Sequence, residues 1–423
     1  MSLLFPNRVS LTRDPLGFLL READHAPAPL APLALGFHRV HLVNDLSLIK
    51  NGPFDSGSPS LADPPSAVFE PITIRESYKK DRITQNKEPD IPPDSANFIG
   101  SIAPDLLINI RRTIFSAYRH ASFDCWHFST SLATKLTFAM LFGFIPKHLI
   151  DQRAFTRYAE LIHSSRDLIA LDIICKREQE RLKREQSCNQ SLQNFSSKIR
   201  TAFEHRQAQS ICGHFYKTES EDFIPLEEIC RLTLAVRQAT AEAFFWTIFA
   251  VARSKILREI IEEEADACLL SNGDLDLDKL HLAKSTRSMS WEILRLAPIN
   301  NILVYFFSTG QNLEAHGARN GDRIVICPHA FFRSERHFPE ADTLIIGRDY
   351  PADLLKLQYL ACGGGLVFRI SLLNLALLFL DLAAAFEFEL VEGPPEFLVL
   401  PSFQAARPDV KVRLNLRRSS LFR

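Results

Sequence analysis

The sequence lacks most of the short motifs that identify an enzyme by inspection. It has no GxxxxGK(S/T) loop and no GxGxxG turn, so nucleotide sites of those two kinds are not expected. It has no HExxH pair, no GxSxG elbow and no DDxxD-like cluster. The nearest approach is DLDLD at Asp274–Asp278, which follows a glycine in a predicted turn between helices. We do not expect it to hold a metal, and the 13 histidines are dispersed without ligand spacing.

The chain also lacks an excess of either charge. It contains 49 Lys and Arg against 50 Asp and Glu, a net charge of −1. This balance provides no electrostatic basis for binding nucleic acid or an anionic membrane surface. The 8 cysteines are scattered without a CxxC pair, so we expect reduced and mostly buried thiols in the cytosol.

Long hydrophobic runs are missing as well. Prolines and charged residues divide the apolar pieces of the first 40 residues, so neither a secretory segment nor a spanning helix is expected there. The apolar run Ile370–Leu382 is about 13 residues long, which is too short to cross a bilayer. These features predict a soluble, cytoplasmic protein without an integral membrane segment.

What is present indicates one domain, residues 1–423, that is mainly α with small β-sheets. A short helix is expected around Pro15–Ala23, followed by strands in FHRVHLVND. Residues 51–98 are rich in Pro, Ser, Asp and Lys and read as a long surface excursion. The charged KREQERLKREQ stretch is expected to be a solvated helix face. No internal repeat is found.

The second half of the chain carries the clearest pattern. Residues 226–272 contain no Gly or Pro, and their middle, LAVRQATAEAFFWTIFAVA, predicts a helix through the centre of the protein. A further helix is expected to end at Leu296, because Pro298 stops it. Short β-type runs follow between Asn300 and Ile326, and PEFLVLPSF and VKVRLNL alternate like a hairpin.

One charged pair has an informative context. Glu292 and Arg295, three residues apart, share one helix face and can pair. Alone this spacing is common on helices. Here it is followed by ARNGDRIVI, with a turn at Asn320-Gly321, and by FFRSERHFPEADTLIIGRDY, which places Phe338-Pro339 ahead of Arg348. The glycine-rich YLACGGGLVFRISLLNLA then leads into an apolar helix.

Taken in this order, the features resemble those of cytochrome P-450, the haem-thiolate monooxygenases, and in particular members of fungal type that act in secondary metabolism. The resemblance implies a mainly α, cytochrome P-450-like single domain. It implies that Glu292, Arg295 and Arg348 form the structural triad of the family. It also implies that Thr240, on the central helix, matches the family's oxygen-handling threonine.

The departures from the family concern the haem site. Where the family has its thiolate, this chain has Arg369, or Ile370 if the loop is one residue longer. No Cys, His or Met follows Cys362, which itself precedes the glycines and could serve as a haem ligand only if the loop were rebuilt. Ala239 replaces the acid that usually precedes the threonine, and Trp126 has Thr130, not an arginine, four residues later.

A haem-free fold of this kind would keep a deep apolar cavity for a hydrophobic molecule. The first hypothesis is therefore a cofactor-independent cyclase or isomerase, such as a Diels–Alder pericyclase, acting on a terpenoid- or polyketide-like intermediate without a redox partner. Polar groups on the central helix, Arg237, Gln238 and Thr240, are the candidate catalytic donors, with structural roles as the alternative. Two other hypotheses stay open: a divergent haem monooxygenase and a non-catalytic lipophile-binding protein.

Overall fold

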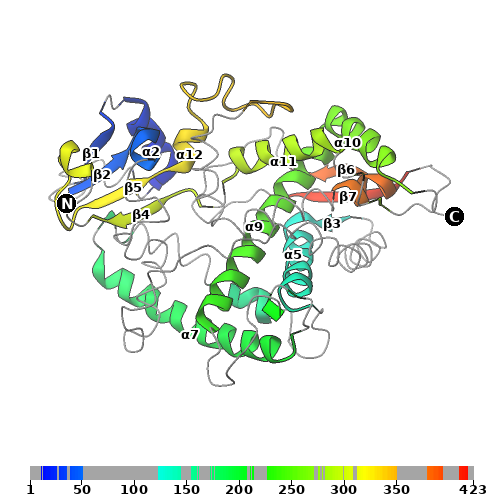
Figure 1. Cartoon of the computed structure of the whole chain (residues 1–423), viewed down its shortest axis with the longest axis horizontal. Helices are drawn as coiled ribbons and strands as arrows, with labels where there is room; N and C mark the ends of the chain where they lie inside the picture. Colours follow the sequence, from blue (N-terminus) through cyan, green and yellow to red (C-terminus); the bar gives the residue numbers. More distant parts are fainter. Residues whose placement is uncertain are drawn as a thin grey trace.

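The longest helix of the described chain, α9 (Leu226–Arg253), runs through the middle of the molecule (Figure 1). Apolar residues cover nearly its whole circumference, and it is buried along most of its length, which confirms the predicted central helix. The computed structural model describes residues 11, 13–25, 28–35, 39–50, 122–143, 154–159, 161, 172, 174–175, 177–206, 210, 212–213, 226–270, 275–276, 279, 282–298, 300–307, 312–349, 379–393 and 409–417.

Helix α5 (Cys125–Phe142) is the main neighbour of α9. The helix begins after Asp124, whose side chain accepts a hydrogen bond from the His127 amide at 2.5 Å and so caps the first turn. It ends at Gly143, whose φ of 80° is left-handed and favours glycine. Sequence analysis did not predict α5, because its apolar residues lie all round the helix and give no amphipathic period.

The remaining helices surround this pair. Helices α10 (Lys255–Ala267) and α11 (Lys284–Leu296) follow α9 in the chain and both pack on it. Helix α11 ends at Leu296, as Pro298 predicted. The others within the described ranges are α2 (Pro15–His25), α3 (Leu46–Lys50), α7 (Glu178–Glu204), α12 (Pro328–Phe332) and the 3-10 helix η6 (Asn312–His316).

A mixed sheet lies beside α2 and α12 at one side of the molecule (Figure 1). In the described residues it has four strands in the order β1-β2-β5-β4: β1 (Leu30–Ala34), β2 (Arg39–Val43), β5 (Arg323–Ile326) and β4 (Leu303–Phe306). Strands β2 and β5 are parallel, and both outer pairs are antiparallel. Strand β1 was not predicted because it contains Pro32, which an edge strand tolerates.

A second sheet joins the last two strands of the described chain to the short strand that precedes α5. Its order is β3-β7-β6, with β3 (Phe123–Asp124), β7 (Lys411–Leu416) and β6 (Phe386–Glu392), and a bulge between Leu390 and Glu392. The strand predicted in VKVRLNL is confirmed as β7. Strand β7 pairs along its length with β6, while PEFLVLPSF lies outside the described residues.

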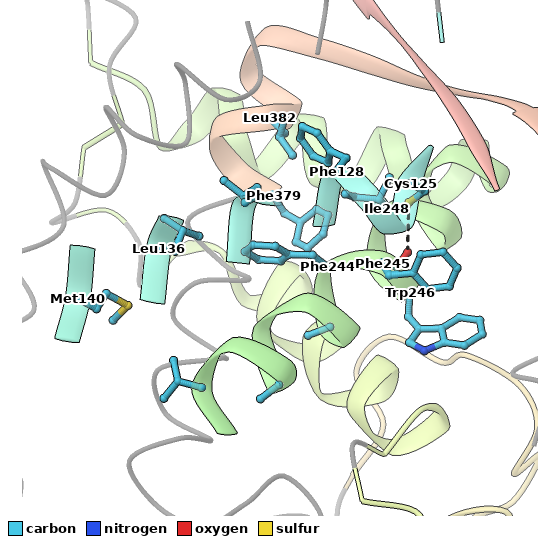
Figure 2. Close-up of a cluster of buried hydrophobic side chains, with 14 of the residues drawn as sticks. Cys125, Phe128, Leu136, Met140, Phe244, Phe245, Trp246, Ile248, Phe379 and Leu382 are labelled. Carbon is cyan, nitrogen blue, oxygen red and sulfur yellow. Dashed lines mark hydrogen bonds between the residues drawn. The ribbon is translucent and has the colours of Figure 1, made fainter. Parts of the chain in front are cut away.

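The main hydrophobic cluster lies where α5, α9 and the helical residues 379–385 meet. Figure 2 shows Phe128 of α5 and Phe244 of α9 turned toward Phe379 and Leu382. Each buried side chain of this size contributes about 1.5–3 kcal/mol relative to exposure. Only the last part of the predicted final helix lies in the described residues. It continues to Ala385, and β6 begins at the next residue, Phe386.

The other sequence expectations have mixed outcomes. Helix α2 and strands β2, β4 and β5 are confirmed, and KREQERLKREQ enters α7, many of whose side chains face solvent. Asn320-Gly321 does form a turn, with Gly321 at a φ of 84°. It is only the last part of a longer connection from β4 to β5 that includes η6. The stretch 51–98 lies outside the described residues.

Among the described residues, no helix combines the length and apolarity that crossing a membrane would require.

Candidate functional site

The predicted charged triad forms a buried hub at the end of α11. The Glu292 carboxylate accepts hydrogen bonds from Arg295, Nε to Oε1 at 2.8 Å and Nη2 to Oε2 at 2.9 Å, and both residues are 0% exposed. Arg348 completes it, with Nε 3.2 Å from the same Oε1. A buried carboxylate with two guanidinium groups is compensated rather than isolated, so the three charges can remain buried together. The structure confirms that these three residues meet.

The two arginines also bind backbone carbonyl groups of residues 332–343. Arg295 donates to Phe332 and Ala341, at 2.8 and 2.5 Å, and Arg348 donates to Pro339 at 2.5 Å. Both also donate to the Thr343 carbonyl, at 3.0 and 3.1 Å. The hub therefore ties α11 to this irregular segment, which is a structural role.

Glu335 holds the same segment from its other side. Its carboxylate accepts the amides of Glu340 and Ala341, each at 3.0 Å. Glu340 has a φ of 53°, a conformation that costs a non-glycine residue energy unless its surroundings hold it. Sequence reasoning did not find Glu335, because a side chain that binds amides five and six residues ahead has no characteristic spacing.

Arg237, the first predicted catalytic residue, faces α5. It is 1% exposed, and its Nε donates to the Thr134 hydroxyl of α5 at 3.0 Å. Thr134 in turn donates to the Thr130 carbonyl at 2.8 Å. Thr134 was not found from the sequence, since a contact between distant helices leaves no local pattern.

Gln238 and Glu242 pair with each other along α9. The Gln238 Nε2 donates to the Glu242 Oε1 at 2.8 Å, a contact between residues one turn apart. Gln238 is 5% exposed, and Glu242 is half-buried. This pair occupies a different side of α9 from the bond that Arg237 makes with α5, because successive residues turn by about 100°.

Thr240, the third candidate, is 0% exposed within α9. At about 100° per residue it lies about 60° from Arg237 and about 160° from Gln238 around the helix. Thr240 and Gln238 therefore point to nearly opposite sides, and α9 does not bring all three predicted donors to one point. Whether any of them is catalytic stays a prediction.

The cysteine side chains that the structure describes belong to the protein core. Cys125, Cys175, Cys212, Cys230, Cys268 and Cys327 are all buried within the hydrophobic clusters. Burial raises the pKa of the Cys125 thiol well above its usual range, although Ser129 acts to lower it. Burial likewise raises the pKa of Cys327 to about 12, against the hydrogen bonds of the Ala330 and His329 amides. Burial therefore favours the protonated form of the Cys125 and Cys327 thiols.

The segment that would face a haem iron lies outside the described residues. This applies to Cys362, to the glycines that follow it and to Arg369 and Ile370. In the sequence, no Cys, His or Met follows Cys362. Within the described ranges, no group of three His, Cys, Asp or Glu could hold a metal ion.

Trp126, considered as part of a propionate clamp, has a core position. Its ring contacts Phe245 of α9 edge-on, with centroids 5.9 Å apart, while Thr130 donates to the His127 carbonyl within α5. The indole thus serves the packing of α5 on α9.

Comparison with known proteins places the fold. No protein-family model matches the chain, and a search of curated proteins finds no match. Among solved structures it is similar to the crystal structure of a cytochrome P-450, CYP102L1, with a TM-score of 0.63 and 14% identity over 95% of this chain and 98% of that chain. The chain therefore has the cytochrome P-450 fold, as the sequence predicted, and a likeness at this identity concerns the fold alone.

Proposed function

We propose that the chain is an enzyme that uses the cytochrome P-450 fold without haem, as a cyclase or isomerase of a hydrophobic terpenoid- or polyketide-like intermediate of secondary metabolism. One observation carries the proposal: a chain of this fold has no Cys, His or Met after Cys362. By resemblance, the position of the iron ligand is taken by Arg369 or Ile370, and neither side chain ligates iron.

The chemistry we propose needs no cofactor. Binding a flexible hydrophobic substrate in a near-attack conformation can lower the activation barrier by several kcal/mol. This is because the entropy cost of ordering the substrate is incurred when it binds and not in the chemical step. In a Diels–Alder cyclisation two carbon–carbon σ bonds form as three π bonds become one, all within the substrate. No electron or proton leaves the molecule, so neither oxidant, reductant nor redox partner is required.

The central helix is the proposed source of polar catalysis. We assign the substrate-facing donor to the Thr240 hydroxyl, which is 0% exposed, because a hydrogen bond to a polarised carbonyl is strong away from water. Gln238 is a second candidate, and its amide donates to the Glu242 carboxylate one turn along the helix. Arg237 donates to α5 at Thr134, which favours a supporting role.

The test is conversion of a panel of linear polyenes that carry a conjugated carbonyl, under nitrogen and without added cofactor. The proposal predicts a product isomeric with its substrate. Thr240→Val should reduce this conversion, and Thr247→Val is the matched control, because the Thr247 hydroxyl donates to the Ala243 carbonyl of its own helix. A product that gains an oxygen atom and needs a reductant would instead establish a monooxygenase. Binding of the panel without any product would establish a lipophile-binding protein.

A further inference from the structure

Helices α5 and α9 are antiparallel and touch through specific contacts at two points. At one point Arg237 of α9 donates to the Thr134 hydroxyl at 3.0 Å. At the other, Phe245 contacts the Trp126 ring at 5.9 Å, and its carbonyl accepts from the Cys125 thiol at 3.8 Å. The step from Arg237 to Phe245 on α9 is as long as the step from Thr134 back to Trp126 on α5. A single register of the two antiparallel helices therefore satisfies both contacts.

Most of the rest of this interface is apolar packing, which is less directional than a hydrogen bond. Eight of the 14 buried residues of α5 are Leu, Ala or Phe, and α9 also buries Ala and Phe. If the helices slid by one turn, about 5.4 Å, one apolar side chain would replace another with little loss of buried area. The Arg237–Thr134 hydrogen bond differs, because its distance and angle requirements are met in one register and lost when the helices slide by a turn.

We propose that Arg237 is a positioning residue that fixes α9 in one register on α5 through Thr134. A single buried polar contact that fixes the register of two helices is the best-attested use of such groups. Thr240 lies less than one turn further along α9, so the register also sets where its hydroxyl stands. The proposal does not depend on the proposed function, since it concerns how two helices are held.

The immediate surroundings support this assignment. Thr134 is 2% exposed and is fully engaged: it accepts from Arg237 and donates to the Thr130 carbonyl at 2.8 Å. Its donor bond orients the hydroxyl, so that the oxygen lone pair faces Arg237. Thr130, one turn earlier and 1% exposed, donates within α5 to His127 at 3.1 Å, which makes it a matched control.

The test replaces Thr134, which leaves the guanidinium in place and keeps the variants foldable. Thr134→Val keeps the shape and removes the acceptor, whereas Thr134→Ser keeps the acceptor. Incorporated 5-fluorotryptophan reports the register, since the Trp126 resonance depends on contact with Phe245. We expect Thr134→Val to lower the folding constant about tenfold and to move the Trp126 resonance. Thr134→Ser and Thr130→Val should leave that resonance in place.

A double-mutant cycle completes the test. In an Arg237→Leu background, Thr134→Val should cost nothing further, because the contact is already absent. If Arg237→Leu does not fold, the Val and Ser variants of Thr134 still decide the matter. An unmoved Trp126 resonance in Thr134→Val, or fully additive losses in the cycle, would overturn the proposal. If a variant loses substrate conversion while its Trp126 resonance stays in place, that loss tests the proposed function and not the register.

Discussion

The Arg348 guanidinium lies 3.2 Å from the Glu292 carboxylate, so the last described segment before residue 350 is held directly by α11. The same carboxylate oxygen accepts from Arg295 at 2.8 Å. One buried anion thus compensates two cations, and the loss of the anion is not equivalent to the loss of either cation.

The first prediction follows from this imbalance. Glu292→Gln leaves two buried guanidinium groups without their carboxylate and should lower the free energy of unfolding by about 3–5 kcal/mol. Urea unfolding followed by circular dichroism measures it. The control, Glu259→Gln, removes an exposed carboxylate 3.4 Å from Lys255 and should change stability by less than about 1 kcal/mol. Equal losses in the two variants would contradict the account.

The second prediction concerns a cap that one helix provides for another. Helix α11 starts after Ala283, which has no capping side chain, and the Glu264 carboxylate of α10 accepts the amides of Ser285 and Thr286 at 2.6 and 2.8 Å. Glu264→Ala should therefore cost about 1–2 kcal/mol of stability. The neighbouring Glu263 is exposed, so Glu263→Ala should be nearly neutral. Thermal unfolding of the two variants measures both losses, and equal losses would show that Glu264 does not cap α11.

The third prediction concerns pH. Burial in α12 lowers the pKa of His329 to about 3, helped by the Arg333 charge and opposed by Asp342. Because the unfolded imidazole binds its proton near its ordinary pKa of about 6.5, the stability from neutral His329 is complete above that pH. It is lost as pH falls from about 6.5 toward 3, by up to about 1.4 kcal/mol per pH unit.

His329→Leu should remove this contribution, so the difference in unfolding free energy between wild type and variant should change across that range. Urea titrations at a series of pH values measure the difference. Two parallel curves would show that His329 does not titrate in this way.

The fourth prediction concerns the buried thiols. Burial raises the pKa of the Cys125 and Cys327 thiols, so neither offers a thiolate near neutral pH. Iodoacetamide at pH about 8 should leave both unlabelled in the native protein and label both after denaturation. Peptide mass spectrometry reads each site. Rapid labelling of native Cys125 would mean that α5 and α9 open far more readily than their packing indicates.

Local patterns in the sequence predicted the fold well. The central helix was readable because it is long and free of breakers, and the end of α11 because Pro298 cannot continue it. Glu292 and Arg295 were found because a pair three residues apart is a local feature. Arg348 was found only through the resemblance to a family, since no spacing on one element connects it to Glu292.

Contacts between distant segments were not readable in the same way. The Arg237–Thr134 bond, the Glu264 cap and the pairing of β7 with β6 each join parts of the chain that carry no mutual signal. Arg237, Gln238 and Thr240 are neighbours in the chain, which by itself does not bring their side chains together. On a helix such neighbours point apart, and that geometry separates them into different surroundings.

The central claim is that this cytochrome P-450 fold works without haem. The most direct test is the visible absorbance spectrum of protein expressed with excess haem precursor, recorded before and after dithionite and carbon monoxide. The account predicts folded protein with no Soret band and no change on adding carbon monoxide. A strong Soret band at near-stoichiometric haem would contradict it and make Cys362 the first residue to replace.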